Sequence, residues 1–205
     1  MKTKLTKLET RMENIKKVGY KLFLEKGYEN TSFKDIIKVS GGSYSSIYDK
    51  YKNKENFFRA IFEEKMELTF FAFEDKMKKS FHLNLRDFLV EFAKEFLHTI
   101  EHKRHVQAYR LVMSVSYQNP SIQQWLSSKS EFALFKVLAK YFENCSEIKD
   151  GFEGSYTMLA KTFCACLKNY LFTEKLVLGA KDLKGDELLR YIDFIINIFL
   201  FGVKK

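Results

Sequence analysis

Apolar residues recur along this chain at intervals of three and four, the spacing of one face of an α-helix. In the first such stretch, residues 8–26, Ile15, Val18 and Leu22 lie on a single stripe. No sustained alternation of apolar and polar residues predicts strands, and nine glycines and one proline in 205 residues leave few helix breakers. The sequence therefore predicts an all-α protein of about nine helices.

Capping signals divide the first fifty residues into three short helices. Gly27 follows a basic last turn and ends the first helix. Ser32, with Asp35 three residues later, forms a capping box for a second helix, which ends before the pair Gly41-Gly42. Ser43 can cap a third short helix. Three short helices joined by tight, glycine-containing turns indicate a helix-turn-helix.

Longer helices are expected in the rest of the chain. One is predicted from Asn53 to about residue 79, and another is opened by Pro120 and continues to residue 142. Residues 155–178 and 186–201 form two strongly apolar helices. The last is apolar on nearly every face and must be buried all round, so we expect it to pair with residues 155–178 in a dimer interface.

Charge is distributed unevenly between the two ends of the chain. The net charge is +9, and residues 1–60 hold 14 Lys and Arg against 7 Asp and Glu, a net charge of +7. A basic head on a nearly neutral body indicates a polyanion as partner for the head. From charge alone, the solvated surface of a basic protein remains an alternative.

The third short helix carries side chains suited to a DNA groove. Ile47 and Tyr51 are predicted to face inward, while its hydroxyl groups can reach phosphate oxygens or base edges. Lys54 lies at a helix N-terminus, where free backbone N–H groups also attract phosphate. The candidate DNA-binding residues are Ser32, Ser43, Tyr44, Ser45, Ser46, Tyr48, Lys50, Lys52 and Lys54.

The head resembles the TetR family of transcriptional regulators. The segment from Phe23 to Ile36, with Gly27-Tyr28 and Thr31-Ser32, is similar to the family's signature for its first two helices. The segment from Ser40 to Glu55 is similar to the recognition-helix signature, in register and without a gap.

This resemblance implies a homodimer that binds a palindromic operator, with each recognition helix in a major groove. It implies that Tyr48 and Lys54 contact phosphates and that three recognition-helix residues can face bases; these are Tyr44, Ser45 and Ser46. It also implies a core formed by Phe23, Phe33, Ile36, Ile47 and Tyr51. Two departures stand out: Gly42 replaces the family's usual valine, and Ile37 replaces a frequent alanine.

Within the family, residues 35–49 are similar to CmeR-type repressors of multidrug efflux operons, as are residues 163–168 and the region of Trp125. This implies a repressor of an efflux or transport operon. Its effector would be a bulky hydrophobic or amphipathic molecule, such as a bile acid. An activator with no efflux role is the alternative.

The C-terminal part is expected to sense a ligand. Seventeen of the 21 phenylalanines follow residue 60, and rigid rings packed between helices leave apolar clefts. The candidate ligand-binding residues are Phe96, Tyr109, Trp125, Phe132, Phe135, Phe163, Cys164, Lys168 and Phe172. Lys168 could pair with an anionic ligand or extend to solvent, and each aromatic could simply be core. We expect a DNA-binding domain at 1–52 and a ligand-binding and dimerisation domain at 53–205.

Other functional classes find little support. No catalytic motif, phosphate-binding loop or cofactor motif is present, so we expect neither an enzyme nor a cofactor. His98, His102 and His105 would share a helix face if one helix continues through all three, but no cysteine or carboxylate completes a metal site. An odd number of cysteines, no signal peptide and no membrane-spanning run predict a cytoplasmic protein that does not contact membranes. An architectural DNA-binding protein without a ligand and a small-molecule carrier remain alternatives.

Overall fold

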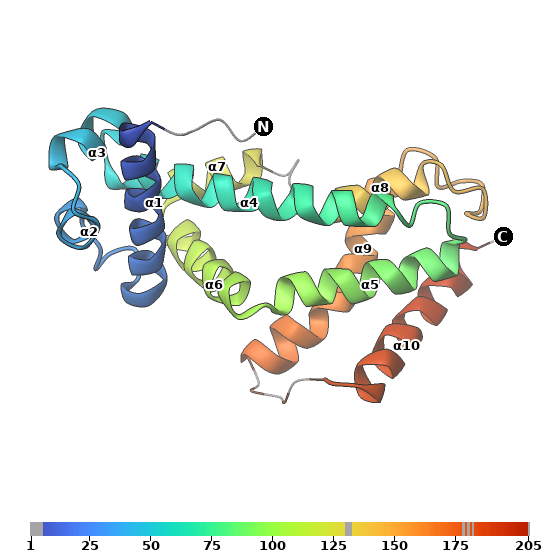
Figure 1. Ribbon diagram of the computed structural model, residues 1–205. Coiled ribbons are helices and arrows are strands. Elements are labelled where there is room, and N and C mark those ends of the chain that lie inside the picture. The colour runs from blue at the N-terminus through green and yellow to red at the C-terminus, as the bar shows by residue number, and fades with distance from the viewer. Residues whose placement is uncertain (1–5, 130–132, 178, 180, 182, 205) are drawn as a thin grey trace. The chain divides into compact units, whose positions relative to one another are not determined.

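The computed structural model describes residues 6–129, 133–177, 179, 181 and 183–204. Over these ranges the chain forms ten α-helices and one π-helical segment, with no strand beyond one isolated β-bridge (Figure 1). The predicted all-α class is therefore confirmed.

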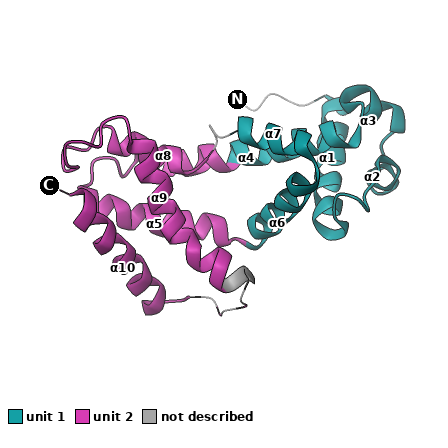
Figure 2. Cartoon of the chain, turned by 180° about the vertical axis from the view of Figure 1, so that it is seen from behind, with its two compact units in different colours: residues 1–68, 103–130 teal, residues 69–102, 131–205 magenta. Residues whose placement is uncertain are grey.

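The helices are grouped into two compact units, each assembled from two stretches of chain (Figure 2). Unit 1 contains residues 1–68 and 103–130, and unit 2 contains residues 69–102 and 131–205. Helix α4 (Lys54–Lys78) contributes to both. The two compact units therefore do not coincide with the two functional domains expected on either side of residue 52. That functional boundary stays a prediction.

Unit 1 consists of α1 (Lys7–Lys26), α2 (Phe33–Ser40), α3 (Tyr44–Tyr51), the first part of α4, α6 (Lys103–Gln118) and α7 (Pro120–Ser128). The expected capping box at Ser32 and Asp35 is confirmed, and Ser43 caps α3 by accepting a hydrogen bond from the Ser46 N–H. Aromatic and branched side chains from all six helices share one core, which buries the five predicted residues Phe23, Phe33, Ile36, Ile47 and Tyr51.

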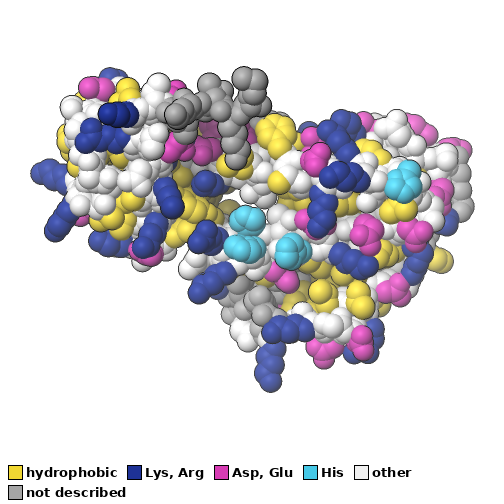
Figure 3. Space-filling model, viewed as in Figure 1, with side chains coloured by type: hydrophobic (Ala, Val, Ile, Leu, Met, Phe, Trp, Pro, Cys, Tyr) yellow, Lys and Arg dark blue, Asp and Glu magenta, His cyan; other side chains and the backbone are white. Residues whose placement is uncertain are grey.

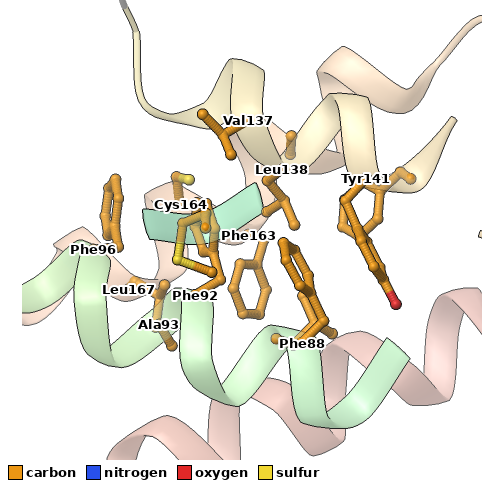
Figure 4. Close-up of a cluster of buried hydrophobic side chains, with 14 of the residues drawn as sticks. Phe88, Phe92, Ala93, Phe96, Val137, Leu138, Tyr141, Phe163, Cys164 and Leu167 are labelled. Atoms are coloured by element: carbon orange, nitrogen blue, oxygen red, sulfur yellow. The ribbon is translucent and has the colours of Figure 1, made fainter. Parts of the chain in front are cut away.

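Unit 2 consists of the end of α4, α5 (Leu85–Glu101), α8 (Phe135–Phe142), α9 (Tyr156–Asn169), the π-helical segment η2 (Tyr170–Val177) and α10 (Asp186–Val203). Phenylalanines spaced by four on α5 form the centre of its core. Phe88 and Phe92 point towards Phe163 of α9, and Tyr141 of α8 stacks on Phe88 with ring centroids 3.7 Å apart (Figure 4).

One predicted helix is wrong. The expected helix over residues 120–142 is two helices, because α7 ends at Ser128 and α8 begins only at Phe135. Lys129 leaves the helical conformation, with φ −98° and ψ 20°, while its N–H still bonds to the Leu126 carbonyl. The two helices also belong to different cores, since Ile122 packs in unit 1 and Leu138 in unit 2. The spacing of apolar residues is helical on both sides of this break, so it does not reveal that the two helices pack in different cores.

Candidate nucleic-acid interface

The turn between α2 and α3 is held in place by α1. Gly41 ends α2 in the left-handed conformation, at φ 71° and ψ 23°, where a side chain would be strained. Arg11 of α1 donates to the Gly41 carbonyl oxygen (3.1 Å), and the Asn14 side-chain amide donates to the Ser40 carbonyl oxygen (3.0 Å). These bonds satisfy carbonyls that the end of a helix leaves unpaired, and they fix the direction in which α3 leaves the turn.

The two departures from the family pattern belong to one packing contact. A Cβ atom at Gly42 would lie 2.9 Å from Ile37 Cδ1 and 2.7 Å from Ile15 Cδ1. The larger side chain at residue 37, together with Ile15, therefore occupies the space that a valine at residue 42 would need.

Helix α3 is buried on one side and exposed on the other. Ile47 is fully buried, and the Tyr51 ring packs edge-on against Phe57 of α4 at 4.9 Å between centroids. On the other side Tyr44 and Tyr48 stack on each other at 6.1 Å and are 49% and 48% exposed. Their rings are held in a defined position, and both tyrosines remain accessible to a partner.

Exposed lysines lie on and around α3 in the head. Ser45, Lys50 and Lys52 are exposed on or just after α3, as are Lys34 and Lys38 on α2. Figure 3 shows Lys and Arg side chains over the face of α1 and α2 in view. Lys34 and Lys38 were not among the predicted DNA-binding residues, although the excess of basic residues in the first 60 positions could have indicated them.

Ser32 and Ser43 have local structural roles. The Ser32 N–H donates to Asp35 Oδ2 (2.9 Å), the Asp35 N–H donates to Ser32 Oγ (3.2 Å), and the two side chains also bond. These hydrogen bonds from Ser32 hold the pKa of Asp35 below its ordinary value. Ser43 Oγ lies 2.6 Å from Ser46 Oγ and 3.1 Å from Ser45 Oγ, so the three hydroxyls form one group at the start of α3.

Lys54 is engaged within the protein. Its ammonium donates to the Tyr28 carbonyl oxygen (2.8 Å), lies 3.9 Å from Glu29 Oε2 and sits 4.3 Å from the centre of the Tyr28 ring. Burial, followed by the charges of Glu55 and Glu29, raises the pKa of Tyr28 to about 12. Lys54 therefore ties the start of α4 to the turn that follows α1, in addition to any contact with DNA.

A polar cluster that the sequence did not reveal joins α4 to the start of α7. Glu55 accepts hydrogen bonds from Asn119 (3.1 Å), from Ser121 (2.9 Å) and from Arg59 (2.5 Å). Burial raises the pKa of Glu55, but the bonds from Asn119 and Ser121 and the Arg59 charge outweigh it, so the pKa is lowered overall. Asn119 lies 64 residues from Glu55, so no local sequence pattern could pair them.

The residues predicted to bind a ligand divide between the two units. Tyr109 and Trp125 belong to unit 1, where Trp125 is buried and its indole N–H donates to Glu63 (3.4 Å). The others that the structure describes belong to unit 2: Phe96, Phe135, Phe163, Cys164, Lys168 and Phe172. Phe132 lies outside the described residues.

Within unit 2, the predicted ligand residues differ in exposure. Phe96, Phe163 and Cys164 are buried in the core (Figure 4), whereas Phe135, Lys168 and Phe172 are partly exposed. Burial raises the pKa of Cys164 to about 12 despite the opposing charge of Lys168, so this thiol stays protonated at neutral pH. Phe96, Phe163 and Cys164 are therefore part of the hydrophobic core of unit 2.

Helix α10 has two apolar faces. Ile192, Ile196 and Val203 are buried in unit 2. Phe194, Ile198 and Phe201 recur at intervals of four and three along the opposite face and are 61%, 59% and 91% exposed. An exposed apolar stripe of this kind is typical of interaction surfaces. None of the helices in the described ranges has the length and apolar character that crossing a membrane demands.

Comparisons with known proteins agree with this geometry. Residues 15–61 match the family described as bacterial regulatory proteins, tetR family. Residues 87–202, more than half of the chain, match the AefR-like transcriptional repressor, C-terminal domain.

Two solved structures share the fold along almost the whole chain. A TetR-family transcriptional regulator from Mesorhizobium loti MAFF303099 is 18% identical with a TM-score of 0.80, covering 98% of this chain and all of that one. The flavonoid-responsive regulator FrrA is 22% identical with a TM-score of 0.69, covering 95% of this chain and 97% of that one.

The transcriptional repressor ComR of Escherichia coli K12 is 30% identical over 79 residues. That match spans 37% of this chain and 38% of ComR, so it relates only part of either protein. The two family matches together span both the helix-turn-helix and the C-terminal helices. The chain therefore belongs to the TetR family of transcriptional regulators.

Proposed function

We propose that this regulator is a homodimeric cytoplasmic repressor that binds a palindromic operator through α3 and is released by a hydrophobic or amphipathic effector. The observation that carries the proposal is the two-sided character of α3. Its inner face is fixed by Ile47 and Tyr51, and its outer face presents tyrosine and serine hydroxyls beside exposed lysines. Such a surface suits the phosphates and base edges of a major groove.

The exposed stripe of α10 supports the dimer. The stripe carries the exposed side chains of Phe194, Ile198 and Phe201. Packing it against the same stripe of a second copy would remove this apolar surface from water, which favours a two-fold symmetric dimer. Two α3 helices related by the same axis would read a palindromic site.

The C-terminal part of the chain supports release by an effector. The match of residues 87–202 to an AefR-like repressor domain supports a negative regulator. The resemblance to CmeR-type proteins supports an efflux or transport operon and a bulky amphipathic effector. Partly exposed Lys168 and Phe172 would serve an anionic, largely apolar molecule. Such an effector can act only by binding the DNA-free conformation more tightly than the DNA-bound one.

Selection from a randomised duplex library, followed by fluorescence anisotropy on the selected site, tests DNA binding directly. We expect the full chain to select a palindrome and to lose affinity steeply as salt concentration rises, because phosphate contacts release counterions. Tyr48→Ala should weaken binding, whereas Tyr156→Ala on α9 should not. A chain that selects no palindrome would overturn the proposal.

Effector release is tested on the same site. Bile salts and hydrophobic dyes are screened by thermal shift, and each molecule that raises the melting temperature is then titrated into the operator complex. The proposal predicts displacement of DNA. A set of compounds that all bind without changing operator affinity would contradict the effector part alone.

A further inference from the structure

Among the residues that the structure describes, the recognition helix carries one carboxylate without a partner. Residues 6–60 contain seven Asp and Glu side chains, and six of them have a partner within unit 1. Glu9 and Asp35 complete capping boxes, and Glu55 accepts bonds from Asn119 and Ser121. The other three form ion pairs: Glu13 with Lys16, Glu25 with Lys21, and Glu29 with Lys54. Over the described ranges, Asp49 of α3 is the exception, and it is exposed.

The position of Asp49 is unfavourable for the free protein. It lies in the last turn of α3, where the negative end of the helix dipole disfavours a carboxylate. It also faces an open hollow of about 490 Å³ lined by Ser46 and Lys50 and by Leu8, Glu9 and Met12 of α1. Glu9 adds a second negative charge there. Helix stability therefore gives no reason for an aspartate at this position.

Asp49 is equally unfavourable for nonspecific binding to DNA. A carboxylate on the exposed face of α3 is repelled by phosphates, which the neighbouring exposed lysines attract. It can favour binding only through a donor on a base edge. In the major groove the donors are the amino groups of cytosine and adenine. Adenine places its N7 acceptor beside the amino group, which repels a carboxylate, whereas cytosine presents the amino donor alone.

We propose, resting on the proposed DNA-binding function, that Asp49 is a specificity-determining residue that accepts a hydrogen bond from the N4 amino group of a cytosine in each operator half-site. The negative charge lowers affinity for every other sequence and so widens the gap between operator and random DNA. Discrimination then comes from repulsion as well as attraction.

Three substitutions in the full chain test this assignment by duplex selection and sequencing. Asp49→Ala should lose the cytosine preference at one position per half-site, a fall in discrimination of roughly tenfold, while binding random duplex more tightly. Asp49→Asn should shift that position towards adenine, which an amide recognises through N6 and N7. Glu25→Gln removes an exposed carboxylate from α1 and should leave the selected motif unchanged.

The outcomes separate this inference from the proposed function. A wild-type chain that selects a palindrome, with the same motif selected by Asp49→Ala, overturns the role of Asp49 alone. A wild-type chain that selects no duplex overturns both proposals. Because Asp49 is exposed, all variants should keep the wild-type circular dichroism spectrum and a melting temperature no lower than that of the wild type.

Discussion

Units 1 and 2 have similar interiors but present different aromatic surfaces. Both bury closely packed phenylalanines between helices. On α3 of unit 1 the exposed rings are tyrosines, Tyr44 and Tyr48, whereas on α10 of unit 2 they are phenylalanines, Phe194 and Phe201. A phenol retains a polar group that can hydrogen-bond to a hydrated polyanion, and a phenyl ring gains most from leaving water altogether. The outward chemistry of a helix, and not its fold, thus separates the proposed DNA-binding surface from the proposed dimer surface.

Removing a central ring from each unit should have the largest effect and should separate their roles. Phe57→Ala deletes a fully buried ring that packs against Phe33 and Tyr51, and we expect a loss of about 3–5 kcal/mol of stability. Phe163→Ala deletes an equally buried ring in unit 2 and is the matched variant.

Denaturant unfolding monitored by circular dichroism gives the free energy of unfolding of both variants. Operator binding, measured under conditions where each variant is still folded, is the second readout. Phe57→Ala should abolish DNA binding and preserve the dimer. The comparison fails if Phe57→Ala binds the operator with wild-type affinity.

A charge on the exposed stripe of α10 should have the next largest effect. Phe201→Asp would place a carboxylate in the proposed interface, and we expect a cost of about 2–4 kcal/mol in dimerisation. Val39→Asp alters a similarly exposed apolar residue of α2 and should leave the dimer intact. Light scattering across a dilution series gives the molecular mass of each. Equal masses for both variants at every concentration would show that α10 is not the interface.

The contact beneath the helix-turn-helix predicts a smaller, compensable effect. Gly42→Val would overlap Ile37 and Ile15, and overpacking of this kind costs about 1–3 kcal/mol. Adding Ile37→Ala should restore part of that stability, because it vacates the same space. Thermal unfolding of the two single variants and the double variant measures the coupling energy. Strict additivity would mean that the two departures from the family pattern are independent.

The smallest expected effects distinguish Lys50, near the end of α3, from Lys54, at the start of α4. Lys54→Ala should lower stability by about 1 kcal/mol, since its charged hydrogen bond to the Tyr28 carbonyl is partly exposed. Lys50→Ala should leave stability unchanged and reduce the salt dependence of operator binding by about one phosphate contact. If Lys54→Ala affects only the salt dependence, its internal contacts are unimportant and its role is to bind phosphate.

Features that depend on near neighbours in sequence were predictable. The capping box of Ser32 and Asp35 and the inward face of Ile47 and Tyr51 follow from spacings of three and four, which a helix converts directly into contacts. Long-range contacts were not. The partners of Lys54 lie some 25 residues earlier in the chain, and the Glu55 cluster spans more than 60.

The sequence by itself determined the all-α class, the short helices of the head and the residues that face inward, because helix caps and helix periodicity act within a few positions. Only the tertiary structure decided that residues 120–142 form two helices in separate cores and that the expected ligand residues divide between the units. It also decided that Lys54 is held by the turn after α1 and that Asp49 alone lacks a partner among the acidic residues of the described head. These outcomes depend on which helices meet, and a residue's choice of partner across the fold leaves no regular interval in the chain.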